Sequence, residues 1–134
     1  MSDLEEICGE LIAELGTRND EHAFHNLIEL GPEILSILMF TFKNEQRPAI
    51  RCRLVEAISE FRDPATIEFL EHASDDTYAS VWKASLDGLV SIGGPAVTAT
   101  LRRVQQKELA GKNKSSERLG WISEALQQTG EDPE

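Results

Sequence analysis

A period of about 31 residues constrains the fold of this chain more than any other feature. Pro32, Pro64 and Pro95 lie 32 and 31 residues apart, and a leucine follows each of them at the sixth position. Periods of roughly 20 to 50 residues are typical of stacked supersecondary units. An apolar triplet at helical spacing precedes each proline: Phe24/Leu27/Leu30, Val55/Ile58/Phe61 and Leu86/Leu89/Ile92.

Each repeat unit is predicted to be a pair of helices. The three residues of each triplet lie on one helical face, which such a unit buries against its neighbours. A break before each proline ends one helix, and the proline opens the next at its first turn. No segment shows the sustained alternation of apolar and polar residues that is typical of a β-strand. We expect helices over residues 3–16, 20–30, 32–44, 47–62, 64–74, 77–92, 95–109 and 116–129.

The pattern continues almost to the end of the chain. We therefore expect one domain over residues 1–130 and a frayed acidic tail over residues 131–134. Ile58 and Leu89 occupy the middle position of their triplets. Both should be core residues, because each helix pair can bury its apolar face only against its neighbours.

Two segments resemble a known repeat family. They are "RPAIRCRLVEAISEFRDPATIEFL" at 47–70 and "DDTYASVWKASLDGLVSIGGPAVTATL" at 75–101. Both resemble HEAT repeats of the phycobilisome-lyase-like kind. The resemblance implies an all-α, right-handed α-solenoid of about four HEAT-like helix hairpins, with helices 20–30, 47–62 and 77–92 on its concave face. It also implies an arginine–aspartate link between neighbouring repeats.

Trp82 departs from this repeat pattern. Arg51 stands where the resemblance implies the linking arginine, and Trp82 occupies the same position one repeat later. Trp82 therefore either replaces the arginine in packing or serves as an anchor for a partner. We expect it on the concave face and partly exposed, with Tyr78 one turn before it and with Lys83 and Asp87 pointing outward beside it.

The formal net charge of −11 limits the partners of this chain. Such a charge repels phosphate backbones, so we expect no nucleic-acid partner. No run of about 18 apolar residues is present, so we expect no membrane partner. The acidic N-terminus is unlike a signal peptide, and we expect a cytoplasmic protein. The charge favours a basic partner or serves only solubility.

Five acidic residues are candidates for one negative strip on successive concave helices. The alternative is an ordinary solvated polar face. The five are Glu56, Glu60, Asp75, Asp76 and Asp87.

The sequence contains no convincing catalytic or metal-binding motif. His22, His25 and Glu29 can share one helical face, but no closing ligand motif appears elsewhere in the chain. Cys8 and Cys52 are isolated from each other, which predicts two buried free thiols. We expect no catalytic residue, metal or cofactor.

Stacked helix pairs present an extended surface, so the leading hypothesis is a non-enzymatic protein-binding module. Small acidic HEAT-like proteins resemble bacterial immunity proteins, which implies an inhibitor that neutralises a basic, toxin-like protein. The alternatives are an adaptor or scaffold for a housekeeping complex and a lyase-like cofactor-handling factor. We expect the free protein to be a monomer.

Overall fold

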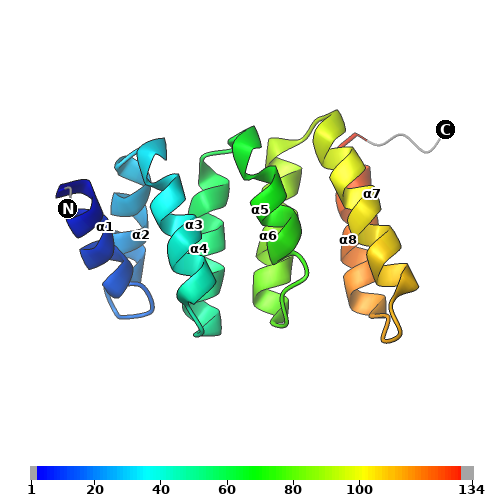
Figure 1. Cartoon of the computed structure of the whole chain (residues 1–134), viewed down its shortest axis with the longest axis horizontal. Helices are drawn as coiled ribbons and strands as arrows, with labels where there is room; N and C mark the ends of the chain where they lie inside the picture. The colour runs from blue at the N-terminus through cyan, green and yellow to red at the C-terminus, as the bar shows by residue number, and fades with distance from the viewer. Residues whose placement is uncertain (1–2, 131–134) are drawn as a thin grey trace.

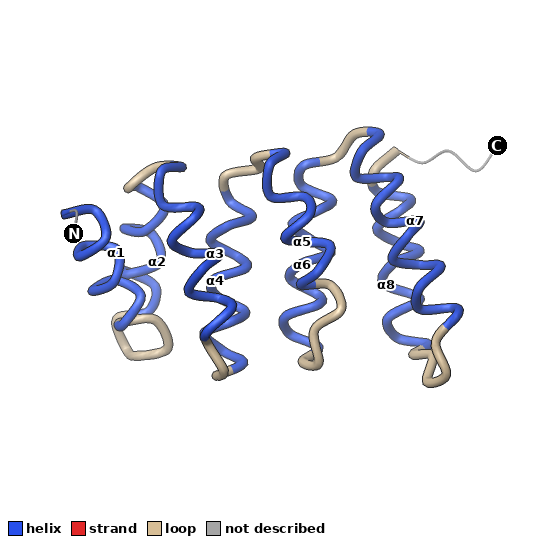
Figure 2. Tube along the Cα trace, viewed as in Figure 1, coloured by secondary structure: helices blue, strands red, loops and turns tan. Residues whose placement is uncertain are grey.

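The protein is all-α in the computed structural model, which describes residues 3–130. The predicted tail at 131–134 lies outside this range. No strand occurs among residues 3–130, and no helix there is long and apolar enough to cross a membrane. Figure 2 shows the helices and their connections. The elements are α1 (Asp3–Ala13), α2 (Asp20–Glu29), η1 (Pro32–Ile34), α3 (Leu35–Asn44), α4 (Pro48–Glu60), η2 (Pro64–Thr66), α5 (Ile67–Ala73), α6 (Ala79–Ile92), α7 (Pro95–Ala110) and α8 (Ser116–Gln128).

The helices form successive pairs along the long axis of the molecule (Figure 1). Helix α1 lies beside α2, α3 beside α4, α5 beside α6, and α7 beside α8. The even-numbered helices also contact one another in order, α2 with α4, α4 with α6 and α6 with α8. These helices therefore make one continuous layer, and α3, α5 and α7 lie in front of it in Figure 1.

The predicted helices all exist, with small differences at their ends. The third and fifth predicted helices each begin with a 3-10 turn, which opens at Pro32 and at Pro64. The first helix ends at Ala13 rather than at residue 16, because the chain turns there. Gly16 has a φ of 82°, which favours glycine, and its N–H donates to Asp20 Oδ1 at 2.7 Å.

Burial follows the 31-residue repeat position by position. In each apolar triplet the first two residues are buried and the third is half-buried. The leucines that follow the prolines (Leu38, Leu70 and Leu101) are fully buried, as are Ile58 and Leu89. The prediction for Ile58 and Leu89 is confirmed, and the repeat is therefore a repeat of core positions.

The two cysteines differ in their surroundings. Cys8 is fully buried, and burial raises the pKa of its thiol to about 11. Cys52 is only half-buried on α4, with its Sγ 3.5 Å from the carbonyl oxygen of Ser80. The predicted burial is therefore correct for Cys8 and wrong for Cys52, which lies at the edge of the contact between α4 and the start of α6.

Helices α4 and α6 approach closely at a glycine. A Cβ atom on Gly88 would lie 2.2 Å from Ser59 Oγ and 3.0 Å from Ser59 Cβ, with Leu70 Cδ1 at 3.3 Å. The Ser59 hydroxyl donates to the carbonyl oxygen of Val55 at 2.8 Å, and this hydrogen bond holds the Ser59 side chain where the added Cβ would lie. The absence of a side chain at residue 88 therefore sets the distance between these two helices.

We expect Gly88→Ala to lower the free energy of unfolding. Overpacking typically costs about 1–3 kcal/mol, which exceeds the gain of about 1 kcal/mol in helix propensity when alanine replaces glycine. The matched control is Gly120→Ala in α8, where the added Cβ meets nothing within 4 Å and should stabilise the protein. Urea denaturation measures both. If Gly88→Ala is as stable as Gly120→Ala, the close approach of α4 and α6 is wrong.

Candidate protein-binding face

A groove between α4 and α6 collects three of the predicted site residues. Glu56 and Glu60 from α4 and Asp87 from α6 line a groove of about 230 Å³. One turn of helix separates Glu56 from Glu60, so both side chains lie on the same side of α4. Arg62, just after the end of α4, is the cation at the rim of this groove.

A second groove continues this surface toward the end of the chain. It lies between α6 and α8, has a volume of about 240 Å³ and shares Asp87 with the first groove. Glu124 of α8 lines it together with Trp121 and Gln128. Glu56, Glu60, Asp87 and Glu124 therefore form one surface across three neighbouring helices, which we call the acidic face.

Three of the four carboxylates on the acidic face form no ion pair in the described chain, although Arg62 lines the same groove as two of them. Glu56 pairs with Arg53 Nη1 at 3.0 Å. Within residues 3–130, no ion pair or hydrogen bond involves the carboxylates of Glu60, Asp87 or Glu124. Burial raises the pKa of Asp87, because desolvation disfavours its charged form and no cation offsets that cost.

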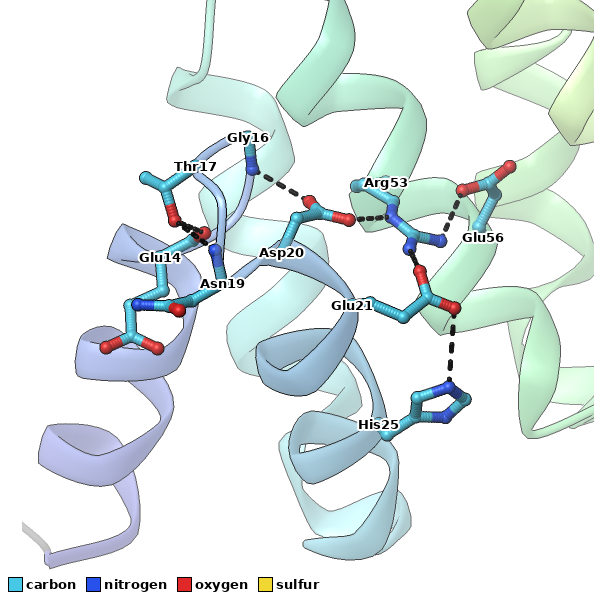
Figure 3. Close-up of polar contacts among 9 residues, drawn as sticks. All are labelled: Glu14, Gly16, Thr17, Asn19, Asp20, Glu21, His25, Arg53 and Glu56. Atoms are coloured by element: carbon cyan, nitrogen blue, oxygen red, sulfur yellow. Dashed lines mark hydrogen bonds and ion pairs between the residues drawn. The ribbon is translucent and has the colours of Figure 1, made fainter.

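Between α2 and α4, by contrast, the carboxylates are ion-paired to one arginine. Figure 3 shows Arg53 of α4 between Asp20 and Glu21 of α2 and Glu56 of its own helix. Its guanidinium contacts Asp20 Oδ2 at 2.8 Å and Glu21 Oε1 at 2.7 Å, and it stacks on the Phe24 ring at 3.9 Å. These contacts join α2 to α4 and pair the carboxylates of Asp20, Glu21 and Glu56 with Arg53.

The structure does not place Asp75 and Asp76 on the acidic face. Asp76 binds Arg51 and is 9% exposed, while Asp75 binds Lys107 at 2.9 Å and Arg118 at 3.7 Å. The expected strip of five acidic residues is therefore wrong for these two. They precede α6 in a loop, where cations from α4, α7 and α8 converge on them.

Trp82 is buried, so the expected partial exposure is wrong. It is 4% exposed, and its ring meets the Trp121 ring of α8 edge to face, with the centroids 6.1 Å apart. Tyr78 is exposed and occupies the N-cap position of α6, without a capping hydrogen bond from its side chain. Lys83 points toward α8 and binds Glu117 at 2.8 Å. Trp82 therefore packs α8 against α6, and it does not form an outward aromatic patch with Tyr78.

The expected arginine–aspartate link exists at Arg51 and is absent one repeat later, at the Trp82 position. Arg51 binds Asp76 and also donates to the carbonyl oxygens of Phe42 and Glu45 at 3.0 and 2.7 Å. One repeat later, where Trp82 stands, Arg118 of α8 places its Cζ 5.0 Å from the Trp82 ring and donates to the carbonyl oxygen of Asp76 at 2.9 Å. The carboxylates nearest to Arg118 are those of Glu108 at 3.3 Å and Asp75 at 3.7 Å, so this guanidinium joins α8 to α7 and to the loop before α6.

Trp121, Arg118 and Glu124 could not be chosen from the sequence. All three lie on α8, which follows the last proline of the 31-residue register. Their only signal was the helical spacing of α8. That spacing does not tell which side chains of α8 lie against α6.

The two histidines of α2 pair with different residues of their own helix. His22 Nε2 lies 3.0 Å from Asn26 Nδ2, and His25 Nε2 lies 3.5 Å from Glu21 Oε2 (Figure 3). In the part of the chain that the structure describes, no three potential ligands are placed to hold a metal ion.

Two carboxylates with lowered pKa values should make the stability of the fold depend on acid pH. Burial alone would raise the pKa of Asp20, but hydrogen bonds from Gly16 and Arg53 and the charge of Arg53 lower it overall. Hydrogen bonds from the Arg47 side chain are the main reason why the pKa of Glu45 falls from 4.5 to about 2. Such groups stabilise the folded state above their unfolded pKa values.

We expect the free energy of unfolding to fall as the pH drops from about 4.5 toward 2, because the unfolded chain takes up these protons first. Urea titrations at a series of pH values measure the loss. Glu45→Gln and Asp20→Asn should each flatten this dependence, and Glu29→Gln, an exposed residue of α2, is the control. An unchanged slope in both test variants would contradict the prediction.

Comparisons with protein-family models, with curated proteins and with solved structures each found no match for this chain.

Proposed function

We propose that this chain is a right-handed, HEAT-like α-solenoid that acts as a non-enzymatic protein-binding module. Its specific role in this proposal is that of a small inhibitor, of the immunity type, that neutralises a basic protein. The basic partner binds on the acidic face, across α4, α6 and α8. The observation that carries the proposal is the set of three unpaired carboxylates on neighbouring helices of one layer, Glu60, Asp87 and Glu124.

The energetics of Asp87 support a binding role. Although Asp87 is exposed, partial desolvation raises its carboxyl pKa, so a modest desolvation cost opposes its charged form. A lysine or arginine of the partner, placed beside Asp87, would remove that cost and would lower its pKa again. Glu60 and Glu124 would take further cations one helix away on either side.

The charge of the whole chain supports a basic partner as well. A net charge of −11 attracts a cationic protein over a long distance and speeds encounter, and the unpaired carboxylates then select the docking face. An inhibitor gains from fast encounter because it must reach its target before the target acts. Final affinity depends on buried contacts more than on the charges.

An adaptor for a larger assembly is the second candidate. A groove of about 590 Å³ on the other helix layer, with the exposed side chain of Phe40, favours it. An adaptor needs two separate protein-binding surfaces, whereas an inhibitor needs only one and can carry a second.

The experiment is capture of partners by the immobilised full chain from its own cells, followed by elution with salt and identification by mass. We expect a basic protein that elutes as the salt concentration rises, and we expect the purified protein to lose its activity when this chain is added back. Captured proteins that are neutral or acidic would contradict the proposal. If a basic partner is captured but keeps its activity, the proposal of a binding module stands and the proposal of an inhibitor is rejected.

A further inference from the structure

We propose that the groove between α3 and α5 binds an amphipathic helix of a protein partner. In this proposal the helix turns acidic residues toward α3 and basic residues toward α5. We call this surface the aromatic groove. Its lining residues used here are Met39, Phe40 and Lys43 of α3, and Glu68, Phe69 and His72 of α5.

The two walls of the aromatic groove match in their spacing. Met39, Phe40 and Lys43 follow one another on a single face of α3, and Glu68, Phe69 and His72 have the same spacing on α5. The groove between them holds about 590 Å³. At its floor the rings of Phe42 and Phe69 meet edge to face, with their centroids 5.1 Å apart. A partner helix can therefore lie along the groove as a third helix.

Phe40 gives the groove an apolar anchor that the fold does not use. Its side chain is 69% exposed, more than those of Ile7, Tyr78 and Leu109, the other exposed large hydrophobic residues of the described chain. Met39 beside it is only partly buried, and a flexible thioether adapts well to an incoming apolar side chain. Exposed apolar surface in a groove is typical of a helix-binding site.

The charges on the two walls determine which helix fits. Lys43 on α3 and Glu68 on α5 have no ion pair within the described chain, whereas Arg51 and Asp76 at the end of the groove neutralise each other. A helix in the groove presents one flank to each wall. An acidic flank against Lys43 and a basic flank against Glu68 satisfy both charges, and this fixes the direction of the helix.

A helix fits this groove better than an extended strand or a second copy of the chain. Both walls are helices whose backbone groups bond internally, so no sheet edge is available to add a strand. A second copy would bring two chains of charge −11 together. The aromatic groove shares no residue with the acidic face and lies on the other helix layer, so this inference is independent of the proposed function.

The test uses the full chain, isotopically labelled, and a short synthetic helical peptide. The peptide has a leucine stripe with glutamates on one flank and lysines on the other, and a control peptide has the same residues in scrambled order. We expect only the ordered peptide to shift the amide resonances of α3 and α5. Phe40→Ser should weaken binding by about fivefold or more, since an aromatic anchor is removed, while Leu109→Ser, on α7, should not.

A spin label on the peptide N-terminus tests the charges. We expect it to broaden resonances at one end of the groove in the native protein. In the double variant Lys43→Glu/Glu68→Lys it should broaden those at the other end, because a reversed helix exchanges its flanks. Shifts outside the groove, no binding, or broadening at the same end in both proteins would overturn the proposal. A free protein that sediments as a dimer dependent on Phe40 would overturn it as well.

Discussion

Trp82→Ala is expected to destabilise the protein by about 3–5 kcal/mol, the usual cost of truncating a buried aromatic residue. Trp82 is 4% exposed, and it fills the space between α6 and α8 against Trp121. Its ring also lies near two cations, with Lys83 Nζ at 5.7 Å and Arg118 Cζ at 5.0 Å. The truncation would therefore leave a cavity and would remove the apolar partner of a mostly buried guanidinium.

Urea denaturation of the variant measures this loss, and Tyr78→Ala is the matched control. Tyr78 is an aromatic residue one turn earlier, but it is 45% exposed. Its truncation should cost less than about 1 kcal/mol, as is usual for surface substitutions. A similar small loss for Trp82→Ala would mean that α8 does not pack on α6 as the structure has it.

The sequence predicts most of the fold because the 31-residue repeat is a repeat of core positions. Leu27, Ile58 and Leu89 have the same place in three successive repeats, on α2, α4 and α6, and all three are fully buried. Local signals then place the helix ends, since Pro32, Pro64 and Pro95 each open a helical segment. Periodicity and proline chemistry act over short distances along the chain, so they can be read without the structure.

The candidate site was predicted only in part, because its charges depend on contacts between distant residues. Asp76 meets Arg51, 25 residues earlier, and Asp75 meets Lys107, 32 residues later. Glu60 and Asp87 have no such partner and remain free. All four residues are carboxylic acids, and the sequence does not distinguish among them. Whether each one is paired depends on where the fold places the arginines and lysines.

The partial exposure expected for Trp82 is wrong for the same reason. Its flanking residues on the same helix, Lys83 and Asp87, indicate an outward face. The residue that covers it, Trp121, belongs to the helix outside the repeat register. A terminal helix packs by the same rules as the others, but its contacts do not recur and so leave no pattern.

Association with the basic partner should slow by about tenfold or more at low salt when the acidic face is reversed, which is within the range of electrostatic steering. The variant is Glu60→Lys/Asp87→Lys/Glu124→Lys. The matched control is Glu6→Lys/Glu10→Lys/Glu33→Lys, which changes the net charge equally on exposed residues of α1 and η1. Equal net charge separates the effect of the acidic face from that of the whole chain.

The association rate constant of these two variants, measured by stopped flow at several salt concentrations, tests the central claim most directly. We expect the acidic-face variant to lose most of its association rate and most of its salt dependence, and the control variant to keep the larger part of both. If the two variants lose rate equally, or if neither loses any, the acidic face is not the surface that receives the partner.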